Sequence, residues 1–280
     1  MEITARMVSQ LREQTGVGMM ECKKALVECE GDIQKALDLL RVRGKAGAEK
    51  RAGRATSEGV VAVASNDARA ALLELCCETD FVARNDEFRH VAQTLADTAA
   101  QTGAATVDAL MAAVTPDGQG AKALLEGLVT RLRENIVVKR VAVAEPEPGG
   151  FLATYAHKVT NKIGVVVSVL GDPANEGHQE AARNTAMHIA AAKPQYVKRE
   201  DVPADVLEHE KQVLAEKTRL EGKPEAAIPK IVEGRVGKFF EQVCLVDQPF
   251  VRDPSVTVGA MLKAAGVSPV SFCMFVVGQE

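Results

Sequence analysis

The sequence has no tryptophan, two tyrosines and an aromatic fraction of 4%, against an apolar fraction of 46%. This composition favours helices and thin sheets, and it argues against a large pocket lined by aromatic side chains. No apolar run approaches the roughly 18 residues that a membrane-spanning helix needs, so we expect no membrane segment. Charged residues make up 26% of the chain. That balance of apolar and charged residues is typical of a globular protein.

The cysteines also lack a functional pattern. None of the six belongs to a C-x-x-C pair, and Cys76 and Cys77 are adjacent. Such spacing predicts neither a zinc site nor a disulfide framework, and reduced thiols fit a reducing compartment. Residues 1–4 lead directly into a predicted helix without the regions of a signal peptide, while Glu2 and Glu13 argue against a transit peptide. We therefore expect a cytoplasmic protein.

The motifs of common enzymes are missing as well. The sequence contains no G-x-S-x-G, H-E-x-x-H or Walker motif. His178 and His188 are separated by about 15 Å along one predicted helix, at the usual rise per residue, so they cannot share a metal ion. The net charge of −4 argues against general nucleic-acid binding. The residues alone predict a binding protein, not an enzyme, with no cofactor and no metal.

The length of 280 residues suits two or three modules, and the residue patterns predict an α+β fold. We expect a three-helix module with a basic linker (1–55), a first α+β module (56–140) and a second one (141–280) with a helical hairpin at about 203–243. The expected helices cover residues 5–14, 19–28, 33–40, 86–101, 107–114, 121–133, 175–192, 205–221, 226–243 and 258–264. The expected strands cover residues 59–64, 70–77, 136–143, 151–156, 163–170 and 270–277.

A corner lies between the second predicted strand and the helix that follows it. Thr79 or Asp80 can cap a short helical turn there by accepting a backbone hydrogen bond. Asn85 or Asp86 can cap the longer helix. Phe81 is unusual, because a large aromatic side chain in a polar turn must pack somewhere. It either packs into the core below the corner or stands out and enters a partner, with the acid beside it. The turn alone leaves both interpretations open.

Two features mark the N-terminal module. The loop Gly16-Val17-Gly18 is similar to the start of a phosphate-binding loop, but no predicted strand precedes it and the third glycine is missing. A tight turn explains these glycines, so we expect no direct nucleotide binding. Met19 and Met20 follow on the next helix, where adjacent side chains cannot both face a small core. At least one of them should be exposed, and methionine suits partner surfaces.

Residues 41–54 are strongly basic, with Glu49 as the one acidic side chain among them. A charge run of this kind is usually a solvated helix end or a linker. The functional alternative is a contact with RNA or with an acidic partner. A further alternative is a thiol enzyme built on Cys76 and Cys77, which requires a lowered thiol pKa.

Several stretches, in matching order along the whole chain, resemble the bacterial elongation factor Ts family. They are residues 15–26 (TGVGMMECKKAL), 79–83 (TDFVA), 188–194 and 234–251. The resemblance implies a ubiquitin-associated-like three-helix module at the N-terminus, a two-part α+β core with antiparallel sheets, and a protruding helical hairpin. Arg133 departs from the family, which often has glycine at that position.

The resemblance also implies a function, that of a guanine nucleotide exchange factor in translation elongation. Such a protein binds the GTPase elongation factor Tu, promotes GDP release by disturbing the Mg²⁺ and phosphate side of its nucleotide site, and lets GTP rebind. The family's contact positions correspond here to Met19, Met20, Lys23, Thr79, Asp80, Phe81, Val82, Asn135 and His157. Phe81 would be the wedge that enters the GTPase. The alternative is an RNA-binding translation accessory protein that uses residues 41–54.

Overall fold

The structure is a computed structural model that describes residues 3–279, apart from the side chains of Lys45, Ala48 and Glu49. Its helices are α1 (Ala5–Thr15), α2 (Met19–Glu28), α3 (Ile33–Arg51), α4 (Asp80–Ala83), α5 (Asp86–Thr102), α6 (Val107–Ala112), α7 (Ala121–Leu132), α8 (Glu176–Ala192), α9 (Ala204–Leu220), α10 (Ile228–Val243) and α11 (Val258–Ala265). Its strands are β1 (Glu58–Ser65), β2 (Ala70–Cys77), β3 (Val137–Ala144), β4 (Gly150–Ala156), β5 (Ile163–Leu170), β6 (Pro249–Phe250), β7 (Asp253–Thr257) and β8 (Ser268–Val276). Met1 and Glu2, on which the predictions about the N-terminal segment partly rest, lie outside the described residues.

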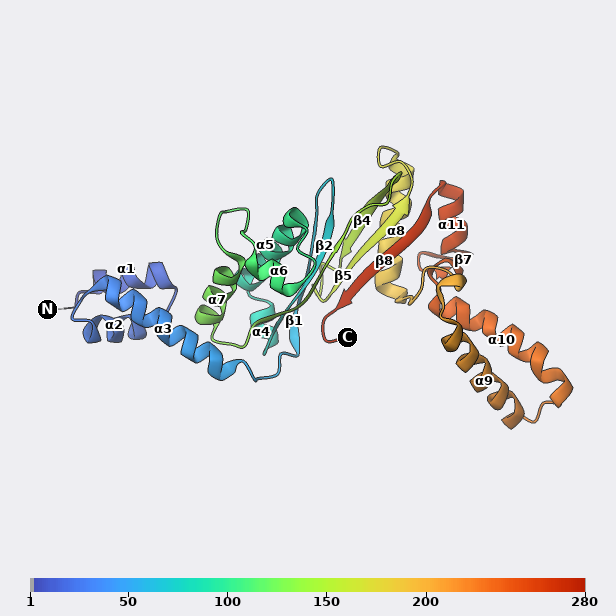
Figure 1. Cartoon of the computed structure of the whole chain (residues 1–280), viewed down its shortest axis with the longest axis horizontal. Helices are drawn as coiled ribbons and strands as arrows, with labels where there is room; N and C mark the ends of the chain where they lie inside the picture. Colours follow the sequence, from blue (N-terminus) through green and yellow to red (C-terminus); the bar gives the residue numbers. More distant parts are fainter. Residues whose placement is uncertain (1–2, 280) are drawn as a thin grey trace.

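Figure 1 shows an elongated molecule. The helices α1 to α3 lie at one end, two antiparallel sheets lie in the middle, and the hairpin of α9 and α10 projects from the other end. The sheets have the strand orders β1-β2-β3 and β4-β5-β8. This combination of helices with antiparallel sheets confirms the predicted α+β fold class.

The N-terminal helices have an apolar core of their own, in which Leu11, Leu26 and Leu40 are buried. Thr4 caps α1, since its side chain accepts a hydrogen bond from the N–H of Met7 at 3.3 Å. Of the two alternatives for the basic segment, a helix end or a linker, the structure selects the helix end for most of its length, because α3 continues to Arg51. Lysine, arginine and alanine are strong helix formers, and here they outweigh the two glycines within this helix.

The first sheet is covered on both faces, which explains why every residue of its central strand β2 is buried. Leu73 and Leu75 pack with residues of α5 to α7 on one face. Leu72 packs on the other face with Val166 and Phe275 of the second sheet. The predicted module boundary at residue 140 lies inside β3, so this module extends to the end of that strand.

The two sheets pack face to face, and Gly164 on β5 lies at a close contact between them. A Cβ atom at this position would lie 2.6 Å from Val61 Cγ1 and 2.8 Å from Val63 Cγ2, so the approach requires glycine. The same layer holds Glu74, which is fully buried and paired with Arg140 at 2.6 Å. This ion pair could not be predicted from the sequence, because its partners are far apart along the chain.

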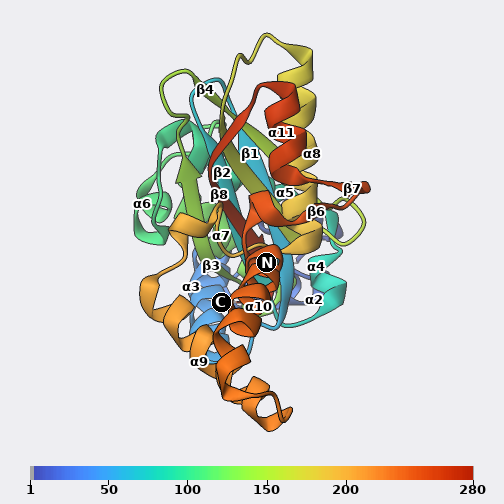
Figure 2. The same ribbon diagram turned by 90° about the vertical axis from the view of Figure 1, so that its right-hand side faces the viewer.

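The outer face of the second sheet is covered by α8 and α11, as Figure 2 shows. The helices α9 and α10 form the expected hairpin and extend away from the sheets. The sequence analysis missed the short strands β6 and β7, which pair with each other just after α10. Strands of so few residues carry too little pattern to be recognised from the sequence.

Candidate functional site

The corner between β2 and α5 is built from two helix caps. Thr79 caps α4, since its side chain accepts a hydrogen bond from the N–H of Val82 at 3.4 Å. Asn85 caps α5, since its side chain accepts hydrogen bonds from the N–H groups of Glu87 and Phe88, at 2.9 and 3.3 Å. The structure therefore selects Thr79 and Asn85 from the alternatives that the sequence left open. Two caps within seven residues fix the path of the backbone here.

Phe81 stands out from this corner with 82% of its surface exposed. Val82 and Ala83, the next two residues, pack instead against the core of the first sheet. The corner is thus anchored on one side and presents an aromatic ring on the other. Of the two interpretations of Phe81, the structure selects the exposed one. A large exposed apolar side chain on a fixed backbone is a typical anchor for a partner protein.

Asp80 lies beside Phe81 and keeps much of its carboxylate accessible. It pairs with Arg84 one turn later at 3.2 Å, and its side chain is 46% exposed. Surface ion pairs of this kind contribute little to stability, so a partner can displace Arg84 at low cost. Asp80 and Phe81 together offer a charged and an aromatic group on one short turn.

Two glutamates, Glu78 and Glu134, link the corner to the segment before β3, and neither was identified from the sequence. One carboxylate oxygen of Glu134 accepts hydrogen bonds from the N–H groups of Glu78 and Thr79, at 2.9 and 3.1 Å. The other accepts one from the hydroxyl of Thr79 at 2.6 Å. In return, Glu78 accepts a hydrogen bond from the N–H of Asn135 at 2.6 Å. This bond is the main cause that lowers the pKa of Glu78, and Arg54 adds to it.

Asn135 is buried beside this brace, with 8% of its surface exposed. Its side-chain amide donates hydrogen bonds to the carbonyl oxygens of Ala52 and Arg54, at 3.3 and 2.7 Å. These bonds fasten the segment that joins α3 to β1. The structure therefore gives Asn135 a structural contact, and its predicted contact with a partner stays a prediction.

The helix α2 presents a second surface. Met19 and Met20 are 56% and 68% exposed, which confirms that at least one of them faces outward. Lys23 is exposed on the same helix. Met20 and Lys23 also line a surface hollow of about 260 Å³, together with Lys24, Val27 and Glu28. The structure thus brings the predicted N-terminal contact residues together on one face.

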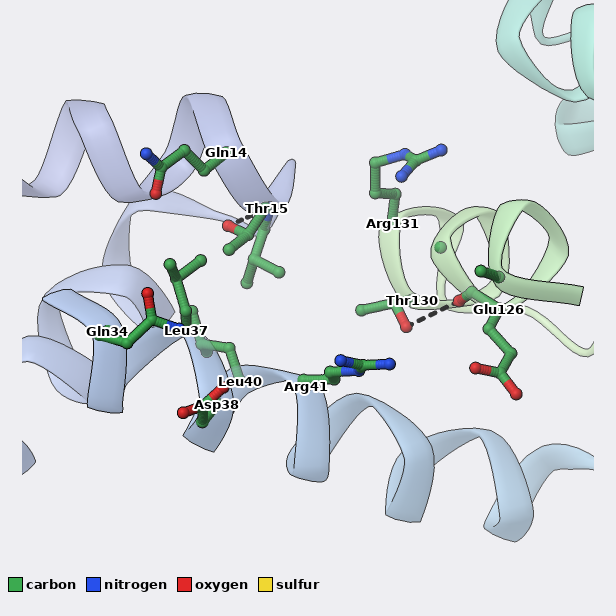
Figure 3. Close-up of a pocket in the computed structure, with 13 residues that line it drawn as sticks. Gln14, Thr15, Gln34, Leu37, Asp38, Leu40, Arg41, Glu126, Thr130 and Arg131 are labelled. Carbon is green, nitrogen blue, oxygen red and sulfur yellow. Dashed lines mark hydrogen bonds between the residues drawn. The ribbon is translucent and has the colours of Figure 1, made fainter. Parts of the chain in front are cut away.

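The N-terminal module meets the core around a cavity that both polar and apolar side chains line. Figure 3 shows this open cavity between α1, α3 and α7, with Thr130 and Arg131 on the core side. Its volume is about 390 Å³. Arg133 follows α7 and forms an ion pair with Glu21 on α2. Its φ of 59° lies in the left-handed region, where glycine is the usual residue. The departure of Arg133 from the family pattern therefore leaves the backbone turn in place and adds a link to α2.

His157 begins the turn between β4 and β5, where its Nδ1 lies 3.3 Å from the hydroxyl of Thr160. The same turn contacts β1, because Lys162 pairs with Glu58 at 2.7 Å. Glu58 lies opposite Cys77, the last residue of β2, so this turn and the Phe81 corner are at the same end of the two sheets. Val159 at the tip of the turn is 87% exposed, which the sequence analysis did not note.

The basic segment is partly neutralised. Arg43 pairs with Glu28, and Arg54 pairs with Glu78 at 3.3 Å. The side chains of Lys45 and Glu49, which belong to the same segment, lie outside the described ones. These pairs weaken the RNA-binding alternative, because a carboxylate beside an arginine reduces its attraction for phosphate.

The thiol-enzyme alternative finds no support in the geometry. Cys76 and Cys77 are buried, and burial raises the pKa of each thiol to about 12. A reactive cysteine needs the opposite shift. Among the side chains that the structure describes, no group of three or more His, Cys, Asp or Glu residues is placed to hold a metal ion. Within residues 3–279, no helix has the length and apolar content that crossing a membrane requires.

Comparison with known proteins decides the family. The family model described as "Elongation factor TS" matches residues 78–279. The chain belongs to this family. It is 44% identical to Elongation factor Ts of Alcanivorax borkumensis over 275 residues, which cover 98% of this chain and 93% of that protein. It is also 44% identical to Elongation factor Ts of Idiomarina loihiensis over 279 residues, which cover 100% of this chain and 92% of that protein.

Membership of the elongation factor Ts family makes the chain a translation elongation factor. The family model begins at Glu78, so its match includes the whole Phe81 corner. The alignments with the two relatives also include nearly all of the chain, and with it the N-terminal helices. The resemblance inferred from the sequence is therefore confirmed at the level of the family.

Proposed function

We propose that this chain is a guanine nucleotide exchange factor that binds elongation factor Tu, promotes the release of GDP and allows GTP to rebind. The observation that carries the proposal is the exposure of Phe81, at 82%, on a corner whose backbone is held by caps and by Glu134. Membership of the elongation factor Ts family supports it. In this role the chain acts by binding, in the cytoplasm, and it makes and breaks no covalent bond.

The energetics of nucleotide exchange determine how much binding free energy the contact with the GTPase must supply. A protein that binds the nucleotide-free GTPase better than the GDP form weakens GDP binding by the same factor. Loosening GDP about ten-thousandfold needs a difference of about 5.5 kcal/mol between the two states. Burial of one phenylalanine side chain supplies about 1.5–3 kcal/mol of this. Phe81 therefore needs other contacts beside it.

The remaining predicted residues supply those contacts. Asp80 and Val82 flank Phe81, and Thr79 sets the turn from which it projects. Met19, Met20 and Lys23 hold the partner through α2, where two exposed methionines adapt to an irregular surface. His157 adds a contact from the turn at the same end of the sheets. The GTPase itself binds the nucleotide, and this chain needs no nucleotide site of its own.

The test is the release of a fluorescent GDP analogue from purified elongation factor Tu. The wild-type chain should accelerate release when present at a small fraction of the GTPase concentration. Phe81→Ala should lose most of this acceleration. Leu220→Ala serves as the matched control, because Leu220 is an equally exposed apolar residue, at 83%, on the distant hairpin. If no concentration of the wild-type chain accelerates release, the proposal is wrong.

The RNA-binding alternative is tested on the same material. It predicts binding to RNA that weakens steeply with salt and no effect on GDP release. Arg41 and Lys50 are exposed on α3 and would be the first residues to contact a phosphate backbone. Binding of this kind without acceleration of GDP release would favour the alternative.

A further inference from the structure

Two properties of the corner make the direction of the Phe81 side chain depend on the contacts of neighbouring residues. The helix that carries it, α4, has four residues, and a helix of one turn has little stability of its own. The ring is 82% exposed, so it has few contacts that could hold it. Its direction must therefore be set by the residues on either side, which are Thr79 before it and Val82 with Ala83 after it.

On the N-terminal side, the anchor is Glu134. Its carboxylate accepts three hydrogen bonds, two from the N–H and hydroxyl of Thr79 and one from the N–H of Glu78. Hydrogen bonds to a carboxylate are stronger than those between neutral groups. Because they hold both the backbone and the side chain of Thr79, they fix the orientation of the residue that caps α4.

Both oxygens of the Glu134 carboxylate accept hydrogen bonds from these donors, and the residue is half-buried. A carboxylate in this position is not offered to a partner as a charge. Its effect on a partner must pass through the geometry of the residues that it holds. The N–H of Asn135 donates a hydrogen bond to the side chain of Glu78, so the two chain segments are joined by hydrogen bonds in both directions.

We propose that Glu134 is a positioning residue for nucleotide exchange, which aims Phe81 by holding Thr79. This inference rests on the proposed exchange function. Without the carboxylate, Thr79 loses the acceptor for its N–H and its hydroxyl, and α4 can rotate about the preceding backbone. The Phe81 ring then spends most of its time in directions that do not fit the partner. Small errors in placement have large effects on rate, and a shift of about 1 Å can cost up to about a hundredfold.

The experiment measures GDP release from elongation factor Tu as a function of the concentration of this chain, for wild type, Glu134→Ala and Glu134→Gln. Two quantities are obtained, the maximal release rate and the concentration that gives half of it. Glu134→Ala should lower the maximal rate by about tenfold or more, while the half-saturating concentration changes by less than about threefold. The bound state still forms through α2, and the wedge is misplaced within it.

Glu134→Gln separates positioning from charge. Glutamine can accept the two N–H bonds through its oxygen and donate from its amide nitrogen to the Thr79 hydroxyl, which then acts as the acceptor. It should therefore keep the maximal rate within about threefold of wild type. Glu145→Ala is the matched control. Glu145 follows β3, whereas Glu134 precedes it, so Glu145 pairs with Arg69 at the end of the strand that is distant from the corner. This control should behave as wild type.

The outcomes are distinct. If Glu134→Ala keeps the wild-type maximal rate, the positioning role is wrong and the proposed function stands. If glutamine lowers the maximal rate as much as alanine does, the charge matters and the positioning role is wrong. If alanine raises only the half-saturating concentration, the residue serves folding or affinity, which also overturns it. If the wild-type chain itself does not accelerate release, the proposed function fails first.

Discussion

The Nε2 atom of His188 lies 2.9 Å from the Oε1 atom of Gln248, inside the second core module. The other ring nitrogen, Nδ1, accepts a hydrogen bond from the N–H of Val251 at 3.1 Å. These partners require a neutral ring that carries its proton on Nε2. His188 is 1% exposed, and burial lowers its pKa. These hydrogen bonds connect residues 188–194 with residues 234–251, two of the stretches that resemble the family.

The stability of the fold should fall as the pH falls below about 6.5, the usual pKa of histidine. The folded protein keeps His188 neutral below that pH, whereas the unfolded chain takes up a proton, so the unfolded state is favoured. The lost stability is at most about 1.4 kcal/mol per pH unit. Carboxylates such as Glu78 and Asp253, whose pKa values are lowered, act only below about pH 4.5.

Urea unfolding at pH 7.5 and pH 5.5 checks this prediction. His188→Asn removes the titrating group and should reduce the difference between the two pH values. His178→Asn is the matched control on the same helix, where His178 sits near the exposed N-terminal end. An unchanged pH dependence in His188→Asn would show that another group is responsible.

Phe81→Ala should leave the fold intact, because an 82% exposed side chain buries little area when the chain folds. Phe88→Ala provides the contrast within the same corner. Phe88 is fully buried in the core of the first module, and its truncation should cost about 3–5 kcal/mol. Thermal melts of the two variants make the comparison. A large drop in the melting temperature of Phe81→Ala would mean that the ring packs into the core in solution.

The sequence was a good guide to the corner because its chemistry is local. A helix cap depends on residues within about three positions, so Thr79 and Asn85 could be named among the candidates before the structure was seen. The direction of Phe81 could not be predicted in this way. It depends on Glu134, which precedes β3, lies beside the end of β2 and is distant from Thr79 only along the chain, so no local pattern marks it.

The same difference between local and long-range contacts explains the other features that were not predicted. The buried pair of Glu74 and Arg140 joins two strands that are far apart along the chain, and a charge in a predicted strand gives no sign of a distant partner. The boundary set at residue 140 cut β3, because strand pairing with β2 decides where the first module ends. Periodicity describes one segment at a time, whereas these features come from contacts between segments.

Cys76 and Cys77 should resist thiol reagents in the native protein. Both are buried, and a pKa of about 12 leaves almost no thiolate at pH 8. Cys29 and Cys273 are both half-buried, and burial raises the pKa of the Cys273 thiol, so Cys29 should react first. Titration with a chromogenic disulfide reagent at pH 8 checks this, and the denatured chain, with all six thiols open, is the control. Fast labelling of Cys76 or Cys77, located by mass spectrometry, would revive the thiol-enzyme alternative.

Removal of residues 1–52 should weaken partner binding and leave the rest of the chain folded. The core of the N-terminal module contains residues 3–40, and the core of the first sheet contains none of them. The truncated chain also lacks Met19 and Met20, so its affinity for elongation factor Tu should fall by about tenfold or more, which corresponds to a loss of about 1.4 kcal/mol. Titration calorimetry and a thermal melt check the two parts. An aggregated or unfolded product would show that the modules share a core.

Arg133→Gly should keep or slightly raise stability while it loosens the N-terminal module. Arginine in the left-handed conformation, with a φ of 59°, costs about 1–2 kcal/mol, which glycine avoids. The lost ion pair with Glu21 is exposed and contributes about 0–1 kcal/mol. The first effect is the larger, so the melting temperature of the core should not fall. The module loses one of its links to the core, and the connecting segment between α3 and β1 should be cut faster by protease.

Glu21→Gln is the matched control for this prediction. It weakens the same ion pair and leaves Arg133 in its left-handed turn, so it should speed cleavage without the gain in stability. Equal cleavage in both variants, with a higher melting temperature in Arg133→Gly alone, would separate the backbone effect from the charge effect. A lower melting temperature in Arg133→Gly would contradict the argument, because it would mean that the arginine side chain contributes more to stability than its backbone conformation costs.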